Sequence, residues 1–220
     1  MAVFINLFVF AHLTVKQPHY IHQQGDAMNL IMQMLMQQMG SNAIGKIAKQ
    51  LGLSNSAATA AVSAAIPLLM SALARNSSSQ EGASSLFNAL TKDHDGSVLD
   101  DITGFLGNPD QGNGAGILSH ILGADREVVQ NRVGQTAGVD GNTMGRVLEM
   151  IAPLVMGQLG RTAQQEQLDP SSLSGLLTEQ KQQAEEQQPD IFGSIGKLLD
   201  SDGDGNPIND LGGLLGKFLR

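Results

Sequence analysis

The chain has 220 residues, of which 41% are apolar and 4% aromatic, and it contains no cysteine or tryptophan. The missing cysteines exclude disulfide bonds, thiol nucleophiles and metal sites with cysteine ligands. Acidic residues outnumber basic ones by 21 to 13, and the resulting formal net charge of −8 opposes binding to nucleic-acid phosphates or to anionic membranes.

Residues 1–27 share no periodicity with the rest of the chain. They open with the apolar run MAVFINLFVFAHL, which is shorter than the roughly 18–20 residues of a membrane span. The run also lacks the basic start and the small-residue cleavage site of a signal peptide. Codons for Gln24 to Asp26 can form a ribosome-binding site just ahead of Met28. We therefore expect residues 1–27 to be a non-native or disordered N-terminal extension, with the natural start at Met28.

An internal repeat is the most specific signal in the sequence. Residues Ile31–Arg75 align without a gap with residues Ile117–Arg161, at a shift of 86 positions. The similarity resumes where GASSLFNAL aligns with DPSSLSGLL. A repeat of this length indicates the duplication of one structural unit. Identical pairs include Ile31/Ile117, Gly52/Gly138, Pro67/Pro153, Leu68/Leu154, Met70/Met156, Leu73/Leu159 and Arg75/Arg161.

Each copy predicts three helices, because apolar residues recur every three or four positions. In the first copy Gly52 is placed to end the second helix, and Ser54 can cap the start of the third. Pro67 lies inside the third helix and should kink it. The second copy has Asp140 and Pro153 at the matching places. The apolar positions of the first copy are Ile31, Met34, Leu35, Met39, Ile44, Ile47, Ala48, Leu51, Ala58, Val62, Ile66, Leu69 and Leu73.

The stretch from Ile47 to Leu69 has the pattern of a helix-turn-helix, which in many proteins binds DNA. After Lys49, however, the only cation through the end of the third helix is Arg75, and alanine and serine dominate that helix. DNA recognition needs side chains that reach base edges and cations that hold phosphates. We therefore expect a homeodomain-like arrangement used for packing, and a nucleic-acid-associated regulator remains the alternative.

Polar segments divide the predicted helical units. They lie at residues 75–82, 107–116 and 178–190. We expect an all-α fold of duplicated homeodomain-like helical bundle units joined by polar linkers, with the first repeat at 28–107 and the second at 117–177. The Gln/Glu-rich segment 178–190 is either a solvated helix or a disordered tether. Residues 191–220 form an acidic loop and a last helix in this prediction.

Three stretches carry a resemblance to a known family. IAKQLGLSNSAATAAVSAAIPLLMSAL, LTKDHDGSVLDDITGFLG and the terminal LGGLLGKFLR resemble the bacterial YidB-like family, a group built on a domain of unknown function. The resemblance covers most of residues 28–220. It implies an all-α, homeodomain-like bundle and no established activity.

An acidic loop near the C-terminus is a candidate calcium site. Asp200, Asp202 and Asp204 occupy alternate positions and Gly205 follows them, as in the first half of an EF-hand loop. The second half departs from that pattern, because the acid that could close the coordination shell, Asp210, comes one residue early. The segment is therefore either an irregular Ca²⁺ loop or a solvated acidic turn before the last helix.

A second acidic stretch, DHDGSVLDD, matches a metal loop less well. Asp93 and Asp95 are its candidate metal ligands, and His94 could join them. In the alternative reading, the stretch from Ser97 to Asp100 is a capping-box start for the helix VLDDITGFL. His120 belongs in this prediction to the surface of a helix.

The sequence carries no converging catalytic set, phosphate-binding loop or dinucleotide-binding fingerprint, so we expect the protein not to be an enzyme. We expect a bacterial, cytoplasmic, non-enzymatic helical module with a structural or protein-interaction role. Calcium at the Asp-rich loop is its candidate stabiliser. The protein partner is unknown, nucleic acid and a membrane span are not expected, and self-association is open.

Overall fold

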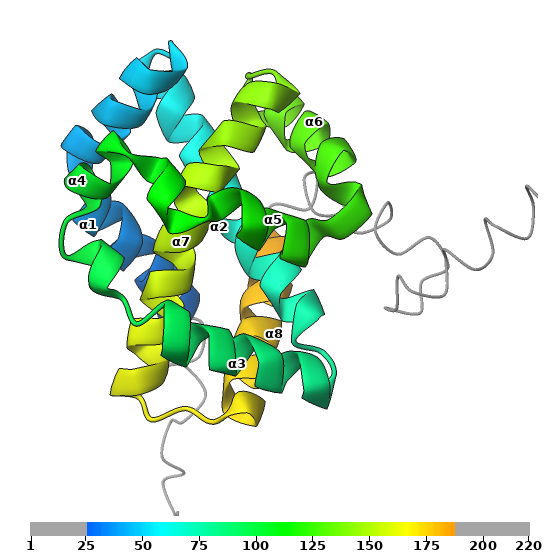
Figure 1. Cartoon of the computed structure of the whole chain (residues 1–220). Helices are drawn as coiled ribbons and strands as arrows, with labels where there is room; N and C mark the ends of the chain where they lie inside the picture. The colour runs from blue at the N-terminus through cyan, green and yellow to red at the C-terminus, as the bar shows by residue number, and fades with distance from the viewer. Residues whose placement is uncertain (1–25, 188–220) are drawn as a thin grey trace, which may run out of the picture.

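The computed structural model describes residues 26–187, and in this range the chain is helical without a β-strand, which confirms the all-α fold (Figure 1). Residues 1–25 and 188–220 lie outside the described range. The α-helices are α1 (Asp26–Leu51), α2 (Asn55–Asn76), α3 (Gln80–Asp93), α4 (Ile102–Gly107), α5 (Gly114–Leu122), α6 (Arg126–Ala137), α7 (Gly141–Gln165) and α8 (Pro170–Gln187). Short 3₁₀ helices are η1 (Ser97–Leu99), η2 (Pro109–Gly112) and η3 (Gly123–Asp125).

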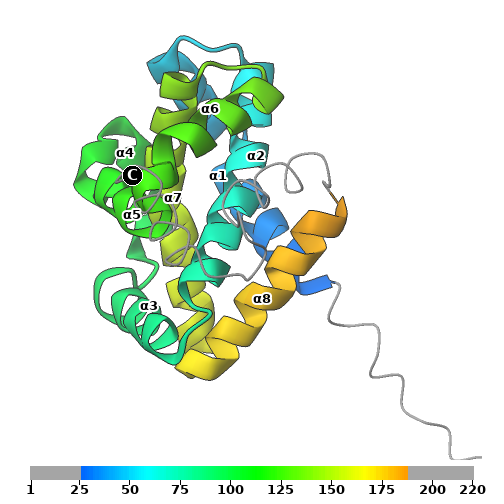
Figure 2. The ribbon, with the colours of Figure 1, turned by 90° about the vertical axis from the view of Figure 1, so that its right-hand side faces the viewer.

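The long helices α2 and α7 cross at the centre of the molecule and pack against each other (Figure 1). Within the first copy α1 packs on α2, and within the second copy α5 and α6 pack on α7. The helices that follow each copy are exchanged: α3 packs on α7, whereas α8 packs along α2 (Figure 2). Each central helix is therefore covered partly by elements of the other half.

A single hydrophobic cluster contains buried residues from both copies. Leu68 and Leu154, which occupy matched positions of α2 and α7, are 2% and 0% exposed. Aromatic side chains contribute little to this core, so it is filled by leucine, isoleucine, valine, methionine and alanine. Alanine on α2 leaves room for close helix approach, in line with packing by short side chains. The two copies thus share one core.

The first helix of the N-terminal copy is broken at Gly40. This residue has φ 55° and ψ −178°, which are not helical values, so α1 consists of two helical segments that meet there. A positive φ is unfavourable for residues with a side chain and is readily adopted by glycine. The break agrees with the two helices predicted for this stretch. In the second copy the corresponding break falls between α5 and α6, where Gly123 has φ 53°.

Both copies end their second helix in the same way. Gly52 and Gly138 have φ of 68° and 74°, the left-handed conformation of a helix C-terminus. The residue after Gly52 donates its backbone N–H to the carbonyl of Ala48 at 2.8 Å. The residue after Gly138 donates to the carbonyl of Gly134 at 2.9 Å. The repeat therefore carries the same local backbone geometry at these positions.

The matched N-caps also have the predicted partners. The Ser54 hydroxyl accepts the backbone N–H of Ala57 at 3.1 Å, and the Asp140 carboxylate accepts that of Thr143 at 3.0 Å. Hydrogen bonds from the hydroxyl and the backbone of Thr143 hold the pKa of Asp140 below its usual value. Each cap satisfies one N–H group that the first turn of a helix leaves without an intrahelical partner.

The polar segments between the helices are shorter than the sequence pattern suggests. α2 continues to Asn76 and α3 begins at Gln80, so most of the segment 75–82 is helical. Segment 178–190 is helical up to Gln187, which selects the helical alternative for its described part. Pro67 and Pro153 lie inside α2 and α7, and both helices continue past them.

Candidate functional site

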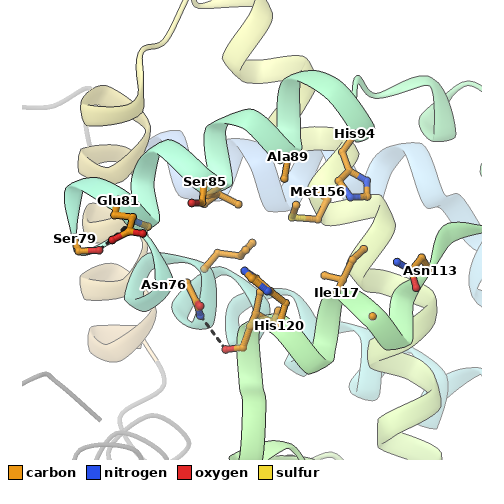
Figure 3. A pocket seen from close by; sticks show the side chains of 15 residues that line it. Asn76, Ser79, Glu81, Ser85, Ala89, His94, Asn113, Ile117, His120 and Met156 are labelled. Carbon is orange, nitrogen blue, oxygen red and sulfur yellow. Dashed lines mark hydrogen bonds between the residues drawn. The ribbon is translucent and has the colours of Figure 1, made fainter. Parts of the chain in front are cut away.

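A groove of about 530 Å³ opens between α3 and α5, above the C-terminal halves of α2 and α7 (Figure 3). This volume lies within the range of roughly 300–1,000 Å³ that is usual for ligand pockets. Helices from both copies build the groove, so its formation depends on the shared core. Its lining residues are Leu73, Asn76, Ser79, Glu81, Gly82, Ser85, Leu86, Ala89, His94, Asn113, Gly116, Ile117, His120, Ile121 and Met156.

The floor of the groove is apolar. Leu73, Leu86, Ile117, Ile121 and Met156 line it, and all five also belong to the hydrophobic core. Because the floor is part of the packed interior, it is a rigid surface whose shape is set by the contacts of the central helices. An apolar group placed on it would be removed from water on several sides, which is favourable in proportion to the area buried.

The rim of the groove is polar and includes two histidines. His94 follows the last residue of α3, and His120 lies in the last turn of α5. Figure 3 shows both imidazoles turned toward the space between the two helices. Burial lowers the pKa of His94 from its usual value, and the nearby carboxylates of Asp93 and Asp95 oppose this shift. The neutral form of His94, which can donate one hydrogen bond and accept another, is therefore favoured.

One rim residue ties the two walls together. The Asn76 side-chain amide donates hydrogen bonds of 2.9 Å to the carbonyl of Ala72 in its own helix and to the carbonyl of Ile121 in α5. The second bond satisfies a carbonyl near the end of α5, where no intrahelical partner is available. It fixes the end of α2 against α5 across 45 residues of sequence. The groove edge is thus held by a specific contact.

The loop of the DHDG stretch lies directly beyond His94 and is organised by hydrogen bonds. Asp95 accepts the backbone N–H of Ser97 at 2.9 Å, and this bond is the main reason why the pKa of Asp95 is lowered. Gly96 has φ 94° and is buried against α7. Arg161 donates to the Gly96 carbonyl and to the Asp100 carboxylate, both at 2.7 Å. These contacts attach the loop to the second copy.

The helix expected to start at Ser97 begins later. Residues Ser97–Leu99 form a 3₁₀ turn, and α4 starts at Ile102 with Asp101 as its N-cap. The Asp101 carboxylate accepts the backbone N–H of Gly104 at 2.7 Å. The capping-box interpretation was wrong in this detail, because Ser97 lies inside a 3₁₀ turn that no side chain caps, and the helix is capped by Asp101.

The candidate metal ligands are placed only in part. Among the described residues, no three histidine, aspartate or glutamate side chains come together in a group that could hold a metal ion. Asp95 is engaged with Ser97, and the assignment of Asp93 and Asp95 as ligands stays a prediction. The calcium residues Asp200, Asp202, Asp204 and Asp210 lie outside the described range.

In the helix-turn-helix element, the helix that would read DNA lies in the core. From Ala61 to Ala74 nearly every residue of α2 is buried. The exposed positions of its first two turns carry no charge; they are Asn55, Ser56, Thr59 and Ala60. Direct readout of DNA requires an accessible helix with polar side chains. This geometry gives the nucleic-acid alternative no support.

The same helix is the one described element long and apolar enough to cross a membrane by composition. Its most apolar window is 72% buried inside the protein, however. That burial is typical of the central helix of a packed core, which passes the same test of length and hydropathy as a membrane span. The hydropathy of α2 is therefore accounted for by its contacts with α1, α7 and α8.

Comparison with known proteins identifies one family. The model of a bacterial protein family of unknown function, DUF937, matches residues 33–162, which is 130 of the 220 residues. The match includes both copies of the repeat and both walls of the groove. No curated protein and no solved structure matches the chain.

Proposed function

This chain belongs to the DUF937 family of bacterial proteins of unknown function, and on that premise we propose that it is a non-enzymatic helical protein-interaction module. The groove between α3 and α5 is the binding surface in this proposal. It receives an apolar side chain, together with flanking backbone, from a partner protein. The observation that carries the proposal is the combination of a core-anchored apolar floor with a polar rim.

The size of the groove suits a short anchored segment. About 530 Å³ is enough for one or two large apolar side chains and is too small for a whole helix. Protein interfaces concentrate their binding free energy in a few such anchors that are surrounded by polar contacts. Ala89 lies on the α3 wall of the groove, and its short side chain leaves the central space open (Figure 3).

The rim supplies hydrogen-bonding groups of different kinds. Asn76 and Asn113 carry amides, Ser79 and Ser85 carry hydroxyls, and Glu81 carries a carboxylate. An extended peptide segment exposes backbone N–H and C=O groups beside its side chains, and amides and hydroxyls can pair with both. The rim thus complements peptide backbone around an apolar anchor better than it complements a strongly charged ligand.

The absence of catalytic activity is part of the proposal. Although two histidines and two serines line the groove, neither imidazole has a hydrogen-bond partner or ion pair among the described residues. A serine nucleophile needs a base within hydrogen-bond reach and a third group that orients the base. These residues support a binding role for His94 and His120 as hydrogen-bond donors or acceptors.

Selection of peptides on the full chain tests the interaction role. We expect random twelve-residue peptides displayed on phage to converge on sequences with one large apolar anchor. Ala89→Trp fills the groove and should weaken the selected peptides tenfold or more, since losing one buried apolar side chain costs about 1.5–3 kcal/mol. Asn88→Trp adds the same ring to an exposed neighbouring position of α3 and should leave binding unchanged.

Two results would contradict the interaction role. Peptides without a shared apolar anchor would show that the floor is not a recognition surface. Equal affinity of anchored peptides for the chain and for Ala89→Trp would place their site elsewhere. Circular dichroism of both tryptophan variants checks that the helical fold is retained.

The calcium site, the YidB-like assignment and a cytoplasmic location accompany this proposal and rest on sequence alone. Asp200, Asp202, Asp204 and Asp210 supply the hard oxygen ligands that calcium prefers. If calcium binds only the folded chain, the melting temperature must rise with its concentration. An unchanged melting temperature at millimolar calcium, relative to chelator, would remove calcium from the proposal.

A further inference from the structure

The docking of α4 on α1 is defined by two side chains that reach its carbonyl groups. Lys46 donates from Nζ to the carbonyl of Thr103, and Gln50 donates from Nε2 to the carbonyl of Leu106 at 2.6 Å. Thr103 is the second residue of α4 and Leu106 is the last but one, so the two bonds hold α4 along its length. The face of α1 that carries Lys46 and Gln50 is therefore a receptor for the backbone of a short helix.

The repeat places a matching face on α6. Adding the shift of 86 residues to Asn42, Lys46 and Gln50 gives Val128, Arg132 and Thr136, which lie four residues apart on one side of α6. Arg132 again offers a cation, and Thr136 again offers a polar group. All three are exposed, whereas α4 contacts the corresponding face of α1. The α6 face has no such cover among the described residues.

Val128 marks this face as unusual. Its side chain is 43% exposed. Among the residues whose exposure the structure describes, no other large apolar residue is exposed. A single exposed valine is unremarkable by itself. Here it coincides with a face that is occupied by a helix in the matched half of the molecule. The coincidence makes this face of α6 a candidate docking surface.

The sequence after α8 contains a match to α4. Residues 190–196, DIFGSIG, align with residues 101–107, DITGFLG, with four identities and a leucine-to-isoleucine change. The order of elements also matches, since α3 precedes α4 as α8 precedes 190–196, and the sequences of α3 and α8 align. The repeat therefore extends further than its two most similar blocks.

The identical positions in this match are those that shape α4. Asp101 caps the helix through the N–H of Gly104, and a Cβ atom at Gly104 would lie 2.0 Å from the Asp101 carboxylate. Glycine at this position lets the capping carboxylate approach the helix closely. Asp190 and Gly193 reproduce this pair in the later segment.

The buried and exposed positions of the match also correspond. Ile102 and Leu106, which are 6% and 0% exposed in α4, become Ile191 and Ile195. The exposed polar residue Thr103, whose carbonyl accepts from Lys46, becomes Phe192, and Asn42, one turn before Lys46 on the receptor face, becomes Val128. Both positions change from polar to apolar, as expected if they belong to one interface.

We propose that residues 190–196 dock as a short helix on the Val128, Arg132 and Thr136 face of α6, as α4 docks on α1. Arg132 takes the part of Lys46 and donates to the carbonyl of Phe192, and the Phe192 ring covers Val128 one turn away. Because α8 ends at Gln187, the segment is tethered close to the protein, and a tether of this kind gives an effective concentration of about millimolar.

Charge favours the same arrangement. Residues 26–187 contain 16 acidic and 9 basic residues, so their formal charge is −7, and Arg132 is one of the few cations on an exposed helix face. Lys46 donates to a backbone carbonyl of α4, and a charged donor makes a stronger hydrogen bond than a neutral one. A receptor cation is therefore present at the matched place in both halves, as Lys46 and as Arg132.

Disulfide trapping in the full chain tests the docking. Because the sequence contains no cysteine, the introduced pair can form no disulfide with a native residue. Val128→Cys combined with Phe192→Cys should form an intramolecular disulfide under mild oxidation, with at least a tenfold excess over a matched control. The control pairs Phe192→Cys with Asn88→Cys, an exposed position on α3. Since Val128 and Asn88 are exposed, neither substitution disturbs the core.

Three outcomes would overturn the proposal. Equal yields for the two pairs would show that the segment samples the surface without a docking site. A covalent dimer in place of a crosslinked monomer would show that the segment covers α6 of a second copy. An unlinked monomer would place the segment elsewhere.

Tryptophan fluorescence gives a second measurement. Phe192→Trp introduces the single tryptophan of the chain. Adding Val128→Asp should shift its emission to longer wavelength, whereas adding Asn88→Asp should not.

Discussion

Arg75 and Arg161 occupy the same position in the two copies and serve opposite purposes. Arg161 donates to the Gly96 carbonyl and to Asp100, so it fastens the α3–α4 loop to α7. In Arg75, Nη1 is buried without a hydrogen-bond partner among the described residues. Burial lowers the pKa of Arg75 from its usual value, and Asp125 opposes the shift.

The two copies share their local backbone geometry but differ in the contacts of their outer side chains. Glycine caps, N-caps and central prolines keep the same backbone geometry in both copies, because these features depend on residues close in sequence. Side chains on the outer faces meet different neighbours and have diverged. The groove lies where the two halves differ, between α3 of one and α5 of the other. A similar backbone and different outer surfaces therefore coexist around one core.

The largest expected effect comes from matched truncations in the core, which test whether the halves are one unit. Leu68→Ala and Leu154→Ala should each lower the free energy of unfolding by about 2–5 kcal/mol, because each leaves a cavity in the interior. Since both side chains belong to the same cluster, urea unfolding followed by circular dichroism should remain a single transition. Two separated transitions in either variant would show that the copies unfold independently.

An intermediate effect separates the two arginines. Arg161→Met should lower the free energy of unfolding by about 1–2 kcal/mol, since it removes a hydrogen bond from a charged donor to the Gly96 carbonyl. Arg75→Met keeps a long apolar side chain and removes a desolvated guanidinium, so stability should change by less than about 0.5 kcal/mol or rise. Denaturant midpoints measure both, and equal losses would contradict the assigned roles.

The smallest effect distinguishes the two N-caps by their response to pH. The folded-state pKa of Asp140 lies below its value in the unfolded chain, which is about 3.9. Its contribution to stability is therefore full above that value and is lost as the pH falls through the folded-state pKa. Ser54 occupies the matched position and does not titrate.

Exchanging the two caps checks this interpretation. Asp140→Ser keeps a capping hydroxyl, so melting temperatures measured from pH 5 down to pH 2 should fall less steeply than those of the parent chain. Ser54→Asp should make the decline steeper, because it adds a second carboxylate that loses its capping interaction on protonation. Parallel curves for all three proteins would show that neither cap contributes to acid sensitivity.

Features set by neighbouring residues could be predicted from the sequence. The roles of Gly52, Ser54 and Asp140 follow from local backbone preferences, and the structure has them in those roles. The start of α4 at Ile102 could not be predicted in this way. The turn before it is bound by Arg161, which lies 65 positions from Gly96, and such a contact leaves no local sequence pattern.

The candidate site depends even more on long-range packing. His94 and His120 were visible as isolated histidines, and the serines near residue 79 as part of a polar linker. What brings them to one groove is the placement of α5 against α3 and the contact of Asn76 with Ile121. No local pattern encodes that placement. The aspartates at 200–210 lie outside the described residues, so the calcium prediction is unchanged.

The exchange of α3 and α8 between the halves has a consequence during synthesis. A ribosome delivers the N-terminal copy first, at about 5–20 residues per second. Until α7 and α8 emerge, α2 is covered only in part by α1 and α3, and α3 lacks the two helices on which it mainly packs. The nascent first half must therefore wait several seconds as an incomplete bundle, which makes it a natural client for chaperones that shield apolar helices.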